Sequence, residues 1–321
     1  MKSGVRDVVV VEALEKTFRA GLLGRKKKVL DGISFRVGDG EIFGFVGPNG
    51  AGKTTTLKVL MGLIRASAGR ATILGHDVAE SAFRRQIGFL PENPYFYEYL
   101  TGREILRFYA RVSGVPRAEI DARATRLLEW VGLSHAADAR LRTYSKGMLQ
   151  RTGIAQALVH DPKVVFLDEP MSGLDPIGRK EIRDLVLRLR ETGKTVFMNT
   201  HILSDVETVC DRVAIIVKGR IRYEGGTHDF LDEGECMSDL VLQAVPPALG
   251  ERLEADRLVV RGRGDRIELR VRDKEVGELL QVALAAGARI VSVSPHRRSL
   301  EEIFLSAVAH QESASAAGMP R

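Results

Sequence analysis

The feature that most constrains this chain is a glycine-rich segment at residues 47–54, GPNGAGKT. The segment matches the pattern G-x-x-x-x-G-K-[ST], follows the strand-like run EIFGFV and opens the helix-like run TTTLKVLMGL. Its glycines allow successive backbone N–H groups to surround a phosphate at the positive end of a helix. The segment therefore predicts a site for a nucleoside triphosphate with magnesium, and an ordinary glycine-rich turn is the disfavoured alternative.

Side chains in and beyond this segment predict the chemistry of the site. Lys53 is expected to reach the β- and γ-phosphates, and the Thr54 hydroxyl is expected to bind Mg²⁺. A predicted parallel strand at 164–168 ends in Asp168 and Glu169, at the edge that faces the ligand crevice of such sheets. We expect Asp168 to hold Mg²⁺ through water and Glu169 to act as general base on the water that attacks the γ-phosphate.

Another strand, predicted at 195–200, is followed by His201, which is placed to hydrogen-bond the γ-phosphate. A lone histidine at a strand end is usually structural, so this prediction depends on the companion motifs.

Apolar runs without polar alternation predict a parallel sheet that is covered on both faces, which is an α/β fold. Residues 5–46 instead show short apolar runs broken by turns, typical of a small β layer. Between 94 and 161 helical periodicity takes over and predicts a helical insertion. The sheet strands are expected at 87–90, 164–168, 195–200 and 212–217, and the helices at 101–112, 119–131, 147–159 and 177–190.

Two domains are predicted, as the length of 321 residues suggests. Residues 1–230 form the α/β domain, with its helical insertion at about 92–160, and residues 236–310 form a small α+β domain after a glycine-rich connector. Residues 311–321 are small and polar and are expected to be disordered. The second domain is expected to contain strand, strand, helix, strand and helix at 256–262, 265–271, 275–286, 288–294 and 300–309.

Composition excludes several classes of protein. No apolar run approaches the twenty or so residues that cross a bilayer, and the first residues lack the apolar run of a signal peptide. Cys210 and Cys236 are too few for a disulfide scaffold or a zinc cluster and fit a reduced compartment. The net charge of +6 does not by itself indicate nucleic acid binding.

A further motif at residues 144–151, YSKGMLQR, precedes the Asp168 strand, and residues 172–175, SGLD, follow it. With these motifs in order between residues 47–54 and His201, the chain resembles the ATP-binding subunit of ABC transporters over about residues 5–228. The resemblance implies a P-loop NTPase fold with a RecA-like parallel sheet, an antiparallel β subdomain and a helical insertion. It also implies an ATP hydrolase that is coupled to transport across a membrane, with ATP and Mg²⁺ as cofactors.

The resemblance further implies which residues meet the nucleotide. Phe18 matches the aromatic residue that stacks on adenine, although a core position in the β layer is the alternative. Residues 144–151 match the signature loop, whose serine and glycine N–H groups donate to the γ-phosphate held by the opposite subunit, and residues 172–175 match the D-loop at the dimer interface. The expected ATP-binding residues are Phe18, Gly47, Pro48, Asn49, Gly50, Ala51, Gly52, Lys53, Thr54, Thr55, Ser145, Lys146, Gly147, Met148 and Asp175. The expected catalytic residues are Glu169 and His201, and the expected metal ligands are Thr54, Asp168 and Glu92.

The chain departs from the family pattern at several positions. Glu92 stands where the family has a glutamine that touches Mg²⁺ and the attacking water, so it either joins the metal site or faces the membrane partner. Lys146 replaces a glycine, Met148 a glutamine and Tyr144 a leucine. These variants and SLEEIF at 299–304 resemble an exporter-type, ABC-2-like branch, in which residues 236–310 would be an accessory domain.

The implied partners are a second copy of the chain, closing head to tail on two ATP molecules, and an integral membrane permease that docks on the insertion around 92–131. The chain is expected to have no transmembrane segment of its own and no nucleic acid partner, and to be peripheral at the cytoplasmic face of the cell membrane. Two other classes are weighed against this one. A soluble ABC ATPase acting on nucleic acid or ribosomes is disfavoured by the single ATPase unit, and an assembly module without turnover is disfavoured by Glu169.

The basic run at 25–28, RKKK, has two interpretations. It is either a solvated hairpin tip or a contact with anionic lipid headgroups.

Overall fold

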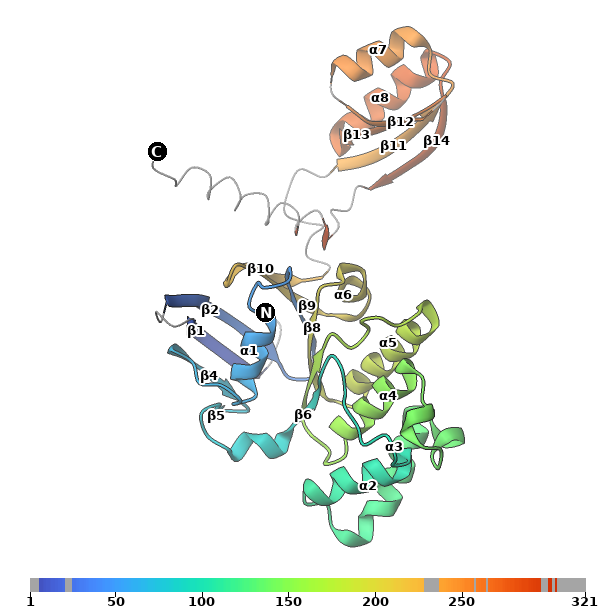
Figure 1. Ribbon diagram of the computed structural model, residues 1–321. Helices are drawn as coiled ribbons and strands as arrows, with labels where there is room; N and C mark the ends of the chain where they lie inside the picture. Colours follow the sequence, from blue (N-terminus) through green and yellow to red (C-terminus); the bar gives the residue numbers. More distant parts are fainter. Residues whose placement is uncertain are drawn as a thin grey trace. The chain divides into compact units, whose positions relative to one another are not determined.

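The computed structural model describes residues 6–20, 25–227, 237–256, 258–263, 265–295, 300, 301 and 304. The described residues up to Thr227 belong to one compact unit, and those from Met237 to Pro295 belong to another (Figure 1). The predicted tail at 311–321, Cys236, most of the predicted last helix and half of the SLEEIF segment lie outside the described residues.

A six-stranded sheet in the order β10-β9-β3-β8-β7-β6 forms the centre of the first unit (Figure 1). All neighbouring strands in it are parallel except β10 and β9. The parallel sheet predicted from the apolar runs is confirmed, because every residue of β3, β7 and β8 is buried, as a strand covered on both faces requires. The strands are β3 (Ile42–Val46), β6 (Ile87–Leu90), β7 (Val164–Asp168), β8 (Thr195–Thr200), β9 (Arg212–Val217) and β10 (Arg220–Gly226).

Helices cover this sheet and connect its strands. Helix α1 (Lys53–Leu60) follows β3, α5 (Pro176–Glu191) runs from β7 to β8, and α6 (Leu203–Val209) runs from β8 to β9. In Figure 1, α1 lies on the other side of the central sheet from α4 and α5. Because the strands are parallel, the segments that follow β3, β7 and β8 all leave the same edge of the sheet.

The predicted β layer is present as a second sheet, in the order β2-β1-β4-β5. Its strands are β1 (Asp7–Ala20), β2 (Arg25–Gly38), β4 (Ala68–Ile73) and β5 (His76–Asp77). The layer differs from the prediction, because the run at 42–46 lies in the central sheet and the unpredicted β4 and β5 complete the layer. The two sheets share an apolar core in which Phe35 lies 5.6 Å from Phe43 and 6.0 Å from Phe197, measured between ring centroids.

The predicted helical insertion consists of α2 (Gly102–Val112), α3 (Ile120–Trp130) and α4 (Lys146–Ala157), each within two residues of its predicted bounds. Short 3₁₀ turns lie at Ala82–Gln86, Arg117–Glu119, Ser134–Ala136 and Leu141–Thr143. Thr101 and Glu104 form a reciprocal capping box at the start of α2. Tyr144, which departs from the family pattern, is buried and its hydroxyl donates to the carbonyl of Ala136 at 2.6 Å, so it fastens the start of α4 to the insertion.

The second unit is a four-stranded antiparallel sheet in the order β12-β13-β11-β14, with two helices and a core of its own. Its elements are β11 (Met237–Gln243), α7 (Pro247–Ala255), β12 (Val259–Arg263), β13 (Arg266–Arg272), α8 (Asp273–Ala285) and β14 (Arg289–Pro295). Strand β11 and helix α7 were not predicted. Strand β11 buries only alternate side chains, Ser238, Leu240 and Leu242. Helix α7 begins at the second of two consecutive prolines, which resemble a loop in the sequence although proline suits the first turn of a helix.

No helix within the described part of the chain has both the length and the apolar character needed to cross a bilayer.

Candidate functional site

The glycine-rich segment forms the loop between β3 and α1. A Cβ atom at Gly47 would collide with the carbonyl oxygen of Ile216 on β9, so only glycine fits there. Gly52 has a φ angle of 114°, in a region that side chains other than glycine avoid, and it directly precedes the first residue of α1. The loop therefore turns sharply enough to bring its backbone N–H groups and the helix N-terminus to one point.

Lys53 begins α1 and is largely buried, with 7% of its surface exposed. Its ammonium group donates to the carbonyl of Gly47 at 2.7 Å and lies 3.9 Å from Oε1 of Glu169. Burial lowers the pKa of the ammonium group, while the carboxylates of Glu169, Asp168 and Glu92 act in the opposite direction. The lysine is thus held at the mouth of the loop between a carbonyl and three carboxylates.

Glu169 lies directly beyond the end of β7 with a φ angle of 48°, which is strained for a residue other than glycine. Such a conformation costs about 1 to 3 kcal/mol and is typically retained at functional sites. Its Oε2 atom is 2.8 Å from Nδ1 of His201 and 3.3 Å from the hydroxyl of Thr200. The structure therefore brings the two predicted catalytic side chains into direct contact, and Thr200 is a neighbour that sequence reasoning missed.

Asp168, the last residue of β7, is buried next to Glu169. Burial raises the pKa of its carboxyl group, whereas the hydrogen bond that Asn199 donates to Oδ1 acts to lower it. The amide oxygen of Asn199 is itself buried and has no hydrogen-bond partner among the residues that the structure describes. A buried amide oxygen without a partner is costly, so its position beside Asp168 fits a hydrated cation there.

Lys53, Glu169 and His201 line a cavity of about 550 Å³. Four lysines and two glutamates line it, and the lysines offer ammonium groups suited to a polyanion. Glu92 is one of the two glutamates, so the structure places it at this cavity, where it also raises the pKa of Asp168. The lining residues are Lys27, Lys28, Val29, Asn49, Gly50, Gly52, Lys53, Thr54, Thr55, Glu92, Glu169, His201 and Lys218.

The basic run at 25–28 is not a hairpin tip, and its contact with anionic lipid headgroups stays a prediction. Residues 25–28 belong to β2, and Lys27 and Lys28 line the cavity. Lys28 also forms ion pairs with Glu15, at 3.0 Å, and with Asp31. The run therefore contributes positive charge to the site of the phosphate loop.

Lys218, which sequence reasoning also missed, comes from the turn between β9 and β10 and has a φ angle of 47°. The next residue, Gly219, donates to the carbonyl of Ala51 at 2.8 Å, so the turn is fastened directly to the glycine-rich loop. No local sequence pattern around Lys218 predicts that it lines the cavity, because its position depends on a backbone contact between distant segments.

Phe18 on β1 is not a core residue, because 39% of its surface is exposed. It pairs with Lys27 across the β1–β2 ladder, and the ammonium group of Lys16 lies 4.9 Å from the centre of its ring. Phe18 does not itself line the cavity, but its cross-strand neighbour does.

The remaining predicted site residues lie apart from this cavity. Ser145 caps α4 by accepting a hydrogen bond from the N–H of Met148 at 3.2 Å, and Asp175 caps α5 by accepting from Gly178 at 2.7 Å. Gly147 is partly exposed, and the ammonium group of Lys146 lies against Gly173. None of the predicted signature residues, nor Asp175, is among the lining of the cavity.

Known proteins resemble this chain in sequence and structure. A family model described as "ABC transporter" matches residues 30–172. An ABC transporter ATP-binding protein of Synechocystis is 41% identical over 307 residues, which cover 93% of this chain and 84% of that protein. A fluoroquinolones export ATP-binding protein of Mycobacterium tuberculosis is 44% identical over 192 residues, covering 59% of this chain and 62% of that protein. A solved structure of the ATP-binding subunit of an ABC transporter superposes with a TM-score of 0.62 at 32% identity, covering 70% of this chain and 92% of that one.

Proposed function

The chain belongs to the ABC transporter ATP-binding proteins and is the ATPase subunit of a transporter, and from this premise we propose how its residues bind and hydrolyse ATP. The observation that carries the proposal is the convergence of Lys53, Glu169 and His201 at the cavity beside the glycine-rich loop. A phosphate-binding loop facing a carboxylate held by a histidine suits hydrolysis of a terminal phosphate.

The triphosphate would lie on the loop, with its negative charge matched by the lysines of the cavity. Lys53 would exchange its bond to the Gly47 carbonyl for the β- and γ-phosphates, which offer charge-assisted hydrogen bonds. Lys27, Lys28 and Lys218 add charge from two other segments. Phe18, beside Lys27 on the neighbouring strand, would stack on the base.

Glu169 is the proposed general base. Its Oε2 atom is engaged by His201, so Oε1 is the oxygen available to take a proton from the attacking water. The water oxygen then bonds to the γ-phosphorus while the bond to the β-phosphate oxygen breaks and ADP is released as the leaving group. Thr54, Asp168 and Glu92 are oxygen donors of the kind that Mg²⁺ prefers, and when bound the ion supplies charge neutralisation at the phosphates.

A second copy of the chain would complete each site. The partly exposed Gly147 and the helix start at Ser145 are not among the residues that line the cavity of their own chain. In a head-to-tail pair each copy would present this loop to the γ-phosphate held by the other, as anion capture at a helix N-terminus allows.

A membrane permease is the proposed second partner, with the chain at the cytoplasmic face of the membrane. An aromatic patch of Tyr95, Tyr97, Tyr99 and Phe108 lies on the surface of the helical insertion, shortly after Glu92. Tyr97 is 5.8 Å from Tyr99 and 6.0 Å from Phe108, so these three rings form one group. Exposed aromatic groups of this kind are typical of protein interfaces, and the relative named for fluoroquinolones export favours export as the direction.

The substitution Glu169→Gln tests the proposed mechanism. It keeps the shape of the side chain and removes the base, so ATP hydrolysis should fall by about 10² to 10⁴ while ATP still binds. A dimer should accumulate in MgATP, as measured by light scattering after size exclusion. Glu191→Gln, at the exposed end of α5, is the matched control and should hydrolyse at the parental rate. Parental hydrolysis by Glu169→Gln would place the base on another residue.

A further inference from the structure

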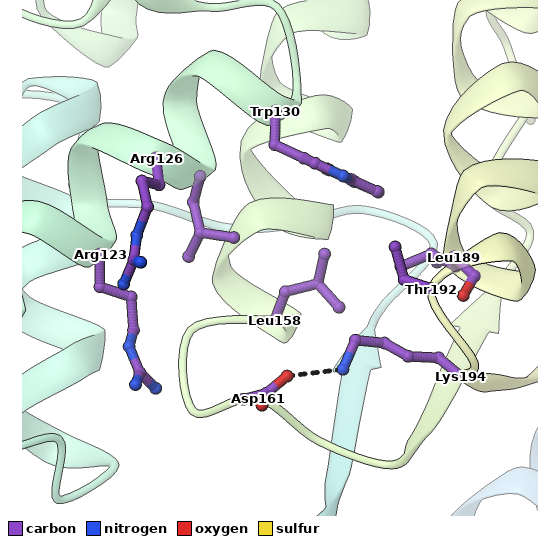
Figure 2. A pocket seen from close by; sticks show the side chains of 9 residues that line it. Arg123, Arg126, Trp130, Leu158, Asp161, Leu189, Thr192 and Lys194 are labelled. Carbon is purple, nitrogen blue, oxygen red and sulfur yellow. Dashed lines mark hydrogen bonds and ion pairs between the residues drawn. The ribbon is translucent and has the colours of Figure 1, made fainter.

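A second cavity, of about 350 Å³, lies where the helical insertion meets the central sheet (Figure 2). It is lined by Asp161, shortly before β7, and by Lys194, which directly precedes β8. Glu169 and His201 follow the other ends of these two parallel strands, so this cavity lies at the sheet edge opposite the nucleotide site. It belongs to neither the ATP site nor the aromatic patch.

The interior of this cavity is apolar. Leu127 and Trp130 come from α3, Leu158 follows α4 and Leu189 belongs to the last turn of α5. Leu158 and Leu189 are buried, and Figure 2 shows Trp130 above them. The guanidinium group of Arg188, which does not line the cavity, lies 4.8 Å from the indole centre and holds the ring in place.

The rim of the cavity is basic. Lys194 is neutralised by Asp161, at 2.7 Å, and Arg123 bonds to Glu119, at 2.8 Å. Arg126 also lines the cavity, is exposed, and has no hydrogen-bond or ion-pair partner among the residues that the structure describes. Figure 2 shows Arg123 and Arg126 together on one side of the cavity. The site therefore combines an apolar interior with one arginine that no described residue pairs with.

We propose that this cavity binds a small amphiphilic anion, with one acid group on Arg126 and an apolar chain or ring against Trp130 and Leu158. A volume at the lower end of the roughly 300–1,000 Å³ of ligand pockets suits a single chain or ring rather than a two-chain membrane lipid. A nucleotide is disfavoured, because no glycine-rich loop lines the cavity. This site is independent of the proposed catalytic mechanism.

Trp130 is the only tryptophan of the chain, so its fluorescence reports directly on this cavity. The experiment titrates decanoate into the full-length protein and follows tryptophan emission, with decanol and decylammonium as neutral and cationic probes of the same chain length. A saturable change is expected with decanoate and a much weaker one with the other two. Vesicles of phosphatidylglycerol should leave the emission unchanged.

Variants of Arg126 sharpen the test. Arg126→Gln should weaken decanoate binding by about tenfold to a hundredfold, the loss expected for a charge-assisted hydrogen bond. Arg126→Glu should reverse the preference, so that decylammonium binds better than decanoate. Arg111→Gln, an exposed arginine at the end of α2 outside the cavity, is the control and should match the parent.

Four outcomes would overturn the proposal. These are an emission that decanoate does not change, equal responses to all three probes, equal weakening by Arg126→Gln and Arg111→Gln, and a response to vesicles without one to decanoate. The last outcome would mean that this face meets a bilayer instead of a free anion. Because Arg126 lies outside the ATP site, its variants should retain parental ATPase activity, which serves as the check on folding.

Discussion

Lys53 is the side chain on which ATP binding should depend most. Its ammonium group lies buried between the loop carbonyl and the carboxylate of Glu169, so no other lysine of the cavity occupies an equivalent place. Lys53→Ala should abolish ATP binding, because charge-assisted bonds of about 1.5 to 3 kcal/mol each are lost from a polyanion site. Isothermal titration with ATP measures the effect. Lys58→Ala, an exposed lysine on the same helix, should bind normally, and undiminished affinity in Lys53→Ala would mean that the phosphate loop is misassigned.

Glu92 should make hydrolysis depend steeply on Mg²⁺. It lines the cavity beside Glu169 and acts electrostatically on Asp168, so three carboxylates repel one another and the triphosphate in the absence of metal. With Mg²⁺ bound, its oxygen is a suitable hard ligand and the repulsion is offset. Glu92→Gln should therefore bind ATP better in EDTA and should show a shallower rise of ATPase rate with Mg²⁺ at fixed ATP. Superimposable Mg²⁺ curves would assign Glu92 to docking or structure instead.

Sequence reasoning predicted the site residues that belong to local motifs and missed those that depend on tertiary contacts. Lys53, Thr54 and Glu169 are recognisable because a loop and a strand end fix their surroundings within a few residues. Lys218 reaches the same cavity through the hydrogen bond from Gly219 to Ala51, and Asn199 meets Asp168 only because β7 and β8 are neighbours. Neither contact leaves a signal in the sequence around the residue itself.

Helix α2 offers a test of how the helical insertion is stabilised. Thr101 and Glu104 satisfy each other's backbone N–H groups at its start. Thr101→Ala should lower the free energy of unfolding by about 1 kcal/mol, the usual cost of losing an N-cap. Chemical denaturation of the full chain measures it. Ser113→Ala changes the residue at the other end of the same helix, where the backbone N–H and not the side chain makes the capping contacts. This variant should change the free energy of unfolding much less. Equal losses of unfolding free energy in the two variants would show that the capping box does not stabilise the helix.

Elements were predictable where burial is complete or amphipathic periodicity is long. Strands β6, β7, β8 and β9 lie where their apolar runs indicated, and α5 differs from its prediction by one residue at each end. The short strands β4 and β5 carry glycine and charged residues, so their structure is decided by the pairing of β4 with β1 and of β5 with β4 rather than by their composition. Strand β11 was missed although it lies at the centre of its sheet, because only one of its faces is buried.

At the scale of the whole molecule, the two units should be separable. The core of the second unit consists of its own residues, among them Leu240, Leu253, Leu269 and Ala283, and shares none with the core of the first. Deleting residues 236–321 should therefore leave a folded ATPase, with the removed domain regulating activity or stabilising the dimer. Circular dichroism and ATP turnover of the shortened chain check this. Loss of all soluble expression would show that the two units depend on a common core.

Ser145 does not line the cavity that contains Lys53, and this separation affects how much ATP a cell consumes. In the proposed head-to-tail pair, each catalytic centre is assembled from two polypeptides, so a newly made copy that has not met another carries only half of the machinery. Such a copy would bind ATP without hydrolysing it. Unpaired copies would therefore not hydrolyse ATP. The rate of ATP hydrolysis would rise with the square of the subunit concentration until all copies are paired.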